Sequence, residues 1–137
     1  MPEDNAARVR SMYDAFSRGD VPFVIGLFDP QIEWREADNF IYPSGPYVGP
    51  QAVLEGVFQR LAVDWEGFAA VPDEILPSGD TVISLGHYHG TYKATGKRAN
   101  AQFVHVFQLR NGKVFRFQQY TDTAQFRDVV SRSAAAR

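Results

Sequence analysis

Residues 19–36 read GDVPFVIGLFDPQIEWRE and contain two hydrophobic periods in succession. The first half predicts a short helix, because Asp20 is a favourable N-cap, Pro22 suits the first turn, and Asp29-Pro30 ends the segment. In the second half apolar and polar side chains alternate, which is typical of a strand with one buried face. A helix that leads directly into a strand indicates a fold that mixes both element types.

Around this stretch the chain predicts further helices and strands. Residues 3–18 carry apolar side chains at helical spacing, Pro50 opens another helix, and residues 37–49 are expected to form a loop. Four later strands are expected over residues 68–76, 81–93, 99–110 and 114–121, followed by a short helix over 124–131. Asn111-Gly112 is a strong hairpin signal between the last two strands. The order predicts an α+β fold with a mainly antiparallel sheet.

Length and composition exclude several classes of protein. The chain has 137 residues, 45% of them hydrophobic, and a net charge of −2, so we expect one domain over 1–137 and no nucleic-acid partner. It contains no cysteine, which excludes disulfides and thiolate chemistry. No apolar run is long enough to span a membrane, and the acidic N-terminus is unlike a signal peptide. We therefore expect a cytoplasmic protein without membrane contact.

Aromatic residues are unusually abundant. The chain has 11 Phe, 6 Tyr and 2 Trp, which together make up 14% of its residues. Part of this ring surface belongs to ordinary helix packing, such as that of Phe16 and Phe58. The remainder suggests a cavity lined by aromatic side chains.

The order of elements around residues 19–36 resembles the nuclear-transport-factor-2-like superfamily, in its SnoaL-like, ketosteroid-isomerase-related branch. The resemblance extends over roughly residues 5–130. Its most specific segments are YVGP at 47–50, GTYKATGK at 90–97, FVHVF at 103–107 and YTDT at 120–123. It implies a cone-shaped curved sheet, with the three helices of the N-terminal half packed on its concave face and closing a pocket.

Glu36 is the first candidate for a catalytic residue. It shares a strand face with Ile32 and Trp34, so alternation directs it inward, and burial beside an indole would raise its pKa toward neutrality. Such a carboxyl group suits a general acid or base. If strand pairing ends before Glu36, its side chain lies instead at a solvated rim. Asp38, two residues further on, is the second choice of carboxylate.

Asp122 and His105 are the other catalytic candidates. The resemblance implies an acid/base aspartate late in the sheet, and Asp122 is its counterpart, although Asp122 is also placed to cap the last helix. His105 lies in an apolar strand in step with Phe103 and Phe107, where a histidine is either a hydrogen-bonded core residue or part of a site. If His105 and Asp122 meet across neighbouring strands, they would form an acid/base dyad.

The expected ligand is a hydrophobic small molecule. Tyr13 lies on the first helix, where the resemblance implies a tyrosine that stabilises an oxyanion, but its helical spacing also fits plain core packing. The ligand-binding candidates are Tyr13, Trp34, Asp38, Phe40, Tyr42, Tyr47, Tyr92, Phe107 and Tyr120.

Nothing in the sequence calls for a metal or a cofactor. His87 and His89 form an H-x-H pair, but no glutamate follows at the spacing of a cupin metal site, so solvent-facing histidines are expected. Phosphate-binding and dinucleotide-binding glycine motifs are absent from the sequence.

Two functions remain open at this point. The first is a cofactor-free acid/base enzyme of the isomerase, cyclase or dehydratase type, acting on a small carbonyl compound. The alternative is a non-catalytic binding or dimerisation module of the same fold. An enzyme needs Glu36 or Asp122 inside the cavity with a perturbed pKa. Apolar residues on both faces of strands 99–110 and 114–121 predict a homodimer through the sheet.

Overall fold

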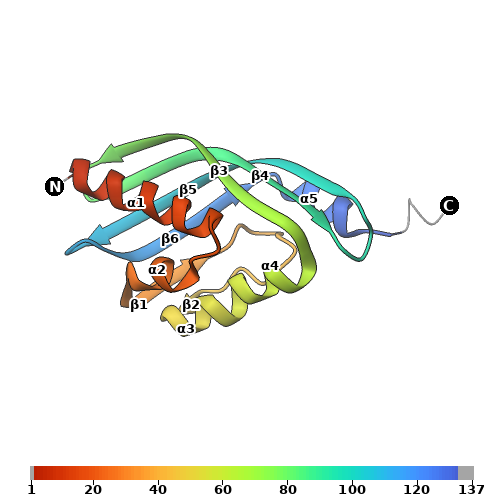
Figure 1. Ribbon diagram of the computed structural model, residues 1–137, viewed down its shortest axis with the longest axis horizontal. Coiled ribbons are helices and arrows are strands. Elements are labelled where there is room, and N and C mark those ends of the chain that lie inside the picture. Colours follow the sequence, from red (N-terminus) through yellow and green to blue (C-terminus); the bar gives the residue numbers. More distant parts are fainter. Residues whose placement is uncertain (1, 133–137) are drawn as a thin grey trace.

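The computed structural model describes residues 2–132, which form an open six-stranded sheet in the order β2-β1-β6-β5-β4-β3 (Figure 1). The strands are β1 (Phe28–Arg35), β2 (Tyr47–Val48), β3 (Trp65–Ser78), β4 (Thr81–Tyr92), β5 (Arg98–Arg110) and β6 (Lys113–Thr121). Neighbouring strands are antiparallel except β1 and β6, which run parallel. The predicted α+β fold with a mainly antiparallel sheet is confirmed.

The helices lie mostly in the N-terminal half, as predicted. They are α1 (Pro2–Ser17), α2 (Val21–Gly26), the continuous helical run of α3 (Pro50–Val53), η1 (Leu54–Phe58) and α4 (Gln59–Asp64), and α5 (Thr123–Val130). Helix α1 crosses one face of the sheet, and α5 lies toward the opposite end of the long axis (Figure 1). Within residues 2–132, no helix combines the length and the apolar character needed to cross a membrane.

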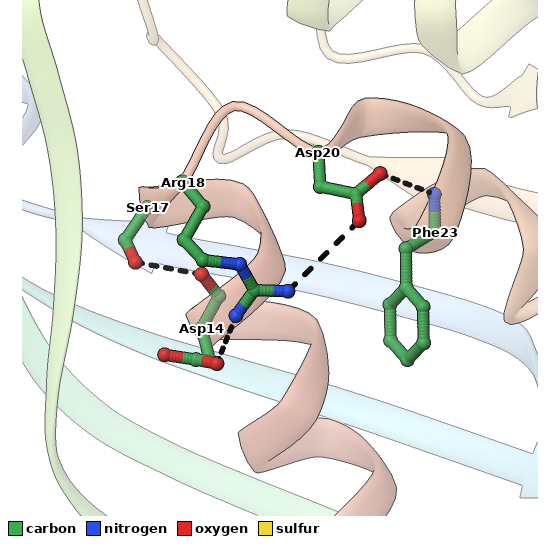
Figure 2. A network of polar contacts seen from close by, with 5 residues as sticks. All are labelled: Asp14, Ser17, Arg18, Asp20 and Phe23. Atoms are coloured by element: carbon green, nitrogen blue, oxygen red, sulfur yellow. Dashed lines mark hydrogen bonds and ion pairs between the residues drawn. The ribbon is translucent and has the colours of Figure 1, made fainter.

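The junction between α1 and α2 forms as the sequence predicts. The Asp20 carboxylate accepts a hydrogen bond of 3.3 Å from the backbone N–H of Phe23 and so caps α2. Arg18 forms an ion pair with Asp14 in the last turn of α1 and lies 3.9 Å from Asp20 (Figure 2). These contacts fix the turn that brings α2 back toward the sheet.

The boundary between α2 and β1 differs from the prediction. Strand β1 begins at Phe28, so Asp29 and Pro30 lie inside the strand and not after the helix. The pairing of β1 with β6 is irregular between Phe28 and Glu33, and an irregular register tolerates a proline, which has no N–H to donate.

The buried faces of the strands follow the predicted alternation. Ile32, Trp34 and Glu36 are all at most 7% exposed. On β5, Phe103 and Phe107 are each 2% exposed, while the intervening valines are partly exposed on the other face. The helices therefore cover one face of the sheet, where the aromatic core lies.

Candidate functional site

A cavity of about 70 Å³ lies between α1 and the sheet, with room for several water molecules. Its walls are largely apolar and come from the helices of the N-terminal half and from five strands. They include Met12, Phe16, Phe58, Phe107 and Phe117. Four of the side chains on the walls carry polar atoms, namely Tyr13, Trp34, Tyr88 and His105, but the surface that they expose to the cavity is entirely apolar. A concave apolar hollow with a few polar groups close behind its wall can hold a small molecule.

His105 is held between two phenols. The Tyr13 hydroxyl lies 2.6 Å from its Nδ1 atom, and the Tyr88 hydroxyl lies 2.5 Å from its Nε2 atom. The imidazole also stacks on Phe103, with the ring centroids 3.9 Å apart. Burial lowers the pKa of His105 to about 3 and raises the pKa of both phenols. At neutral pH the three rings therefore form an uncharged hydrogen-bonded chain.

Gln119 extends this chain across the sheet. It lies opposite His105 on β6, and its Nε2 donates to the Tyr88 hydroxyl over 2.9 Å. Its Oε1 accepts a hydrogen bond of 3.0 Å from the backbone N–H of Ala37. On the other side of His105, β4 places Ser84, which is fully buried. A polar row thus crosses an otherwise aromatic core.

Glu36 is buried, as alternation predicted. Its side chain is 4% exposed, and burial raises its pKa to about 7. The indole Nε1 of Trp34 donates to its Oε2 over 3.3 Å. Glu36 itself is not on the cavity wall, and Trp34 lies on that wall next to it. The carboxyl group is therefore one side chain away from the cavity.

Asp122 and Asp38 lie outside the cluster. Asp122 is exposed and caps α5, where its carboxylate accepts a hydrogen bond of 3.2 Å from the N–H of Gln125. The structure therefore does not bring Asp122 to His105, whose two ring nitrogens are taken by tyrosines. Asp38 is exposed beside a surface hollow at the end of the sheet.

Three of the predicted ligand-binding residues line the cavity, namely Tyr13, Trp34 and Phe107. Tyr120 is instead 55% exposed, because alternation along β6 directs its neighbour Gln119 inward and Tyr120 outward.

The other aromatic candidates pack elsewhere. Phe40 contacts Phe126 of α5, with ring centroids 4.9 Å apart. Tyr42 donates a hydrogen bond of 2.8 Å to Asp64 and accepts one of 3.2 Å from Trp65. Tyr92 packs edge-on against Trp65, and the Tyr47 hydroxyl donates to a backbone carbonyl in the preceding loop. Phe40, Tyr42, Trp65 and Tyr92 thus form a second aromatic cluster against Phe126 of α5, and Tyr47 is not part of it among the described ring contacts.

The H-x-H pair lies on β4 at the protein surface. His87 is hydrogen-bonded to Asp73 over 2.8 Å, and the ring of His89 lies beside it. Within the part of the chain that the structure describes, no three His, Cys, Asp or Glu side chains cluster as metal ligands would.

Sequence reasoning missed Tyr88 and Gln119 as site residues. The sequence contained a signal for both residues. Tyr88 lies on the same face of β4 as the buried Ser84, and Gln119 lies on the same face of β6 as the buried Phe117. A glutamine in step with buried aromatic residues predicts a buried amide that needs partners.

The model of the SnoaL-like domain family matches residues 9–117 of this sequence. The chain belongs to this family. It matches none of the curated proteins. The resemblance inferred from the sequence is thus confirmed.

Solved structures agree with this assignment. An NTF2-like protein from Burkholderia thailandensis E264 is 33% identical, with a TM-score of 0.88 over 93% of this chain and 97% of that chain. An NTF2-like protein of unknown function from Burkholderia pseudomallei K96243 is 27% identical, with a TM-score of 0.85 over 93% and 98%. A protein from Jannaschia sp. CCS1, classed among SnoaL-like polyketide cyclases, is 15% identical, with a TM-score of 0.82 over 96% and 94%. At 15% identity, the similarity to the Jannaschia protein shows only that the two chains share a fold.

Proposed function

We propose that this SnoaL-like protein is a cofactor-free acid/base enzyme. It would bind a small, largely apolar carbonyl compound in the cavity under α1 and move a proton on it. The cavity measures about 70 Å³ and must widen to admit an aromatic ring, because benzene occupies a cavity of about 150 Å³. The reaction type would be isomerisation, cyclisation or dehydration. The observation that carries the proposal is the buried hydrogen-bonded chain of Tyr13, His105 and Tyr88, whose rings form part of the wall of an apolar cavity.

The chain of rings suits the binding of a polarised oxygen. Inside a low-dielectric wall, a phenol hydrogen bond to a carbonyl oxygen is stronger than in water and stabilises negative charge that develops on the oxygen. His105 has a pKa of about 3, so it is a weak base and serves to hold the two phenols in place. Glu36 is the acid/base group, because a pKa of about 7 allows it both to take up and to release a proton near neutral pH.

A non-catalytic binding module is the second candidate function. One observation favours it: neither Glu36 nor Asp122 is on the cavity wall, and Trp34 stands between Glu36 and the cavity. A general base must come within hydrogen-bonding reach of the proton it removes, directly or through one water molecule. Catalysis therefore requires the Trp34 indole to move when a substrate binds.

Proton exchange on a bound ketone separates the two functions. Aromatic ketones and enones are first screened for those that raise the melting temperature of the protein. The best compound is then followed by NMR in D₂O, where the enzyme should exchange its α-hydrogens for deuterium. Glu36→Gln should slow this exchange at least tenfold while keeping the thermal shift, and Asp122→Asn should leave both unchanged. Binding without exchange in the wild-type protein would favour the binding module.

A further inference from the structure

The hydrogen bonds that run from Ala37 to Tyr13 have a direction set at one end. A backbone N–H can only donate, so the Ala37 N–H identifies the Gln119 atom 3.0 Å away as the amide oxygen. The other end of the amide is then the NH₂ group, which donates to the Tyr88 hydroxyl over 2.9 Å. Gln119 is 3% exposed, so water does not supply an alternative.

The direction continues through the rings. The Tyr88 oxygen already accepts a hydrogen bond from Gln119, and its own hydrogen points to the next acceptor, the His105 Nε2 atom 2.5 Å away. A neutral imidazole carries one hydrogen, which must then lie on Nδ1 and point to the Tyr13 oxygen 2.6 Å away. In the opposite tautomer the hydrogen of Tyr88 would have no acceptor among the described contacts, which is costly for a buried hydroxyl.

This direction leaves the hydrogen of Tyr13 without an acceptor in the chain. The ring of Tyr13 lies on the cavity wall, and its hydroxyl lies behind that wall. Ser84 is the nearby group that can take it, because the Ser84 hydroxyl is buried and has no other hydrogen-bond partner among the described residues. A ligand oxygen that only accepts, such as a carbonyl, can replace Ser84 as the partner.

We propose that Gln119 is a positioning residue that fixes the direction of these four hydrogen bonds, and that it thereby makes the cavity select ligands with an acceptor oxygen at Tyr13. The second part rests on the proposed function, because it assumes that the cavity binds a ligand. The direction of the hydrogen bonds depends only on the protein's own side chains and does not depend on the proposed function. Gln119 acts through Tyr88 and His105 and touches no substrate.

The tautomer of His105 tests the first part without a ligand. Long-range ¹H–¹⁵N NMR on ¹⁵N-labelled protein distinguishes a protonated ring nitrogen from an unprotonated one. We expect Nδ1–H in the wild-type protein. Gln119→Glu, measured above pH 8, replaces the donating NH₂ group next to the Tyr88 hydroxyl with a carboxylate, which can only accept hydrogen bonds. Tyr88 should then donate its hydrogen to this carboxylate. The His105 hydrogen should move to Nε2 and point to the Tyr88 oxygen. Gln118→Glu is the matched control, because Gln118 lies on the other face of β6 and should leave the tautomer unchanged.

A second variant covers the case in which the buried carboxylate prevents folding. Gln119→Leu removes the amide that donates to Tyr88 without adding charge. We expect the His105 signals to move toward a mixture of both tautomers. Nε2–H in the wild-type protein, or Nδ1–H that persists in every folded Gln119 variant, would overturn the proposal.

The ligand preference is measured with acetophenone and ethylbenzene, which have similar shapes and differ in the carbonyl. The wild-type protein should bind acetophenone about tenfold more tightly, the value of one buried hydrogen bond. Gln119→Glu should lose this preference. If the tautomer is Nδ1–H and the wild-type protein binds neither compound, the proposed function fails while the role of Gln119 in the chain stands. Equal binding of both compounds would overturn the selection of acceptors.

Discussion

At the scale of single residues, burial shifts two titratable groups in opposite directions. Glu36 and His105 both lose water, and in each case the charged form is disfavoured. The carboxyl group therefore keeps its proton up to about pH 7, while the imidazole stays without its second proton down to about pH 3. Both groups are neutral at slightly acidic pH, which keeps the aromatic core free of charge.

The two shifts predict the pH dependence of stability. The folded protein binds the Glu36 proton more tightly than the unfolded chain, so Glu36 lowers the free energy of unfolding as the pH rises from about 4.5 to about 7. The difference of roughly 2.5 pKa units corresponds to about 3 kcal/mol. His105 acts in the opposite sense, because its folded pKa is depressed: stability is lost as the pH falls from about 6.5 to about 3.

Chemical denaturation of the wild-type protein and of Glu36→Gln over this pH range measures how much the ionisation of Glu36 changes the free energy of unfolding. Glutamine still accepts the Trp34 hydrogen bond but does not ionise. Relative to the wild type, the variant should therefore gain about 3 kcal/mol of stability between pH 4.5 and pH 8. A difference that does not change with pH would show that Glu36 is ionised at neutral pH and is not shielded from water.

At the scale of elements, the periodic segments were predictable and the partners across the sheet were not. Alternation placed Glu36 and His105 on buried faces, because a strand has only two faces. Tyr13, however, lies 92 residues before His105, and no local pattern states that they meet. The 37–46 loop has no period at all, so the packing of Phe40 against α5 could not be predicted from its sequence.

The close approach of the β3 backbone to Gly86 of the neighbouring strand β4 gives a prediction at this scale. A Cβ atom at Gly86 would lie 2.2 Å from the Val71 carbonyl oxygen and 2.6 Å from the Phe103 ring. Gly86→Ala should therefore destabilise the fold by about 2–3 kcal/mol through overpacking, as measured by urea denaturation. Gly26→Ala is the control, because no described heavy atom lies within 4 Å of its Cβ position, and it should be neutral or slightly stabilising. Equal effects of both substitutions would contradict the packing of β3 on β4.

At the scale of the whole molecule, the sheet has a second face that the helices do not cover. Val104 and Val106 of β5 are partly exposed there, and Leu76 of β3 and Tyr120 of β6 are 43% and 55% exposed. A surface hollow on this face also contains charged side chains, among them Arg116. We propose that a second copy of the chain covers this face, as the apolar residues on both sides of β5 predicted.

Sedimentation at micromolar concentration measures the oligomeric state. The wild-type protein should sediment as a dimer, and Val106→Asp should sediment as a folded monomer, because a charge on an apolar interface is not paired. Val63→Asp, at a valine that is 70% exposed on α4, should remain dimeric. A monomeric wild-type protein would contradict the homodimer.

The central claim is that the cavity beneath α1 is the site where this protein binds its ligand. A crystal structure of the protein with the best ketone from the thermal-shift screen tests it most directly. The account predicts the ring of the ketone among the aromatic walls and its carbonyl oxygen about 3 Å from the Tyr13 hydroxyl. A ketone bound in a surface hollow, or one whose oxygen lies away from Tyr13, would contradict it.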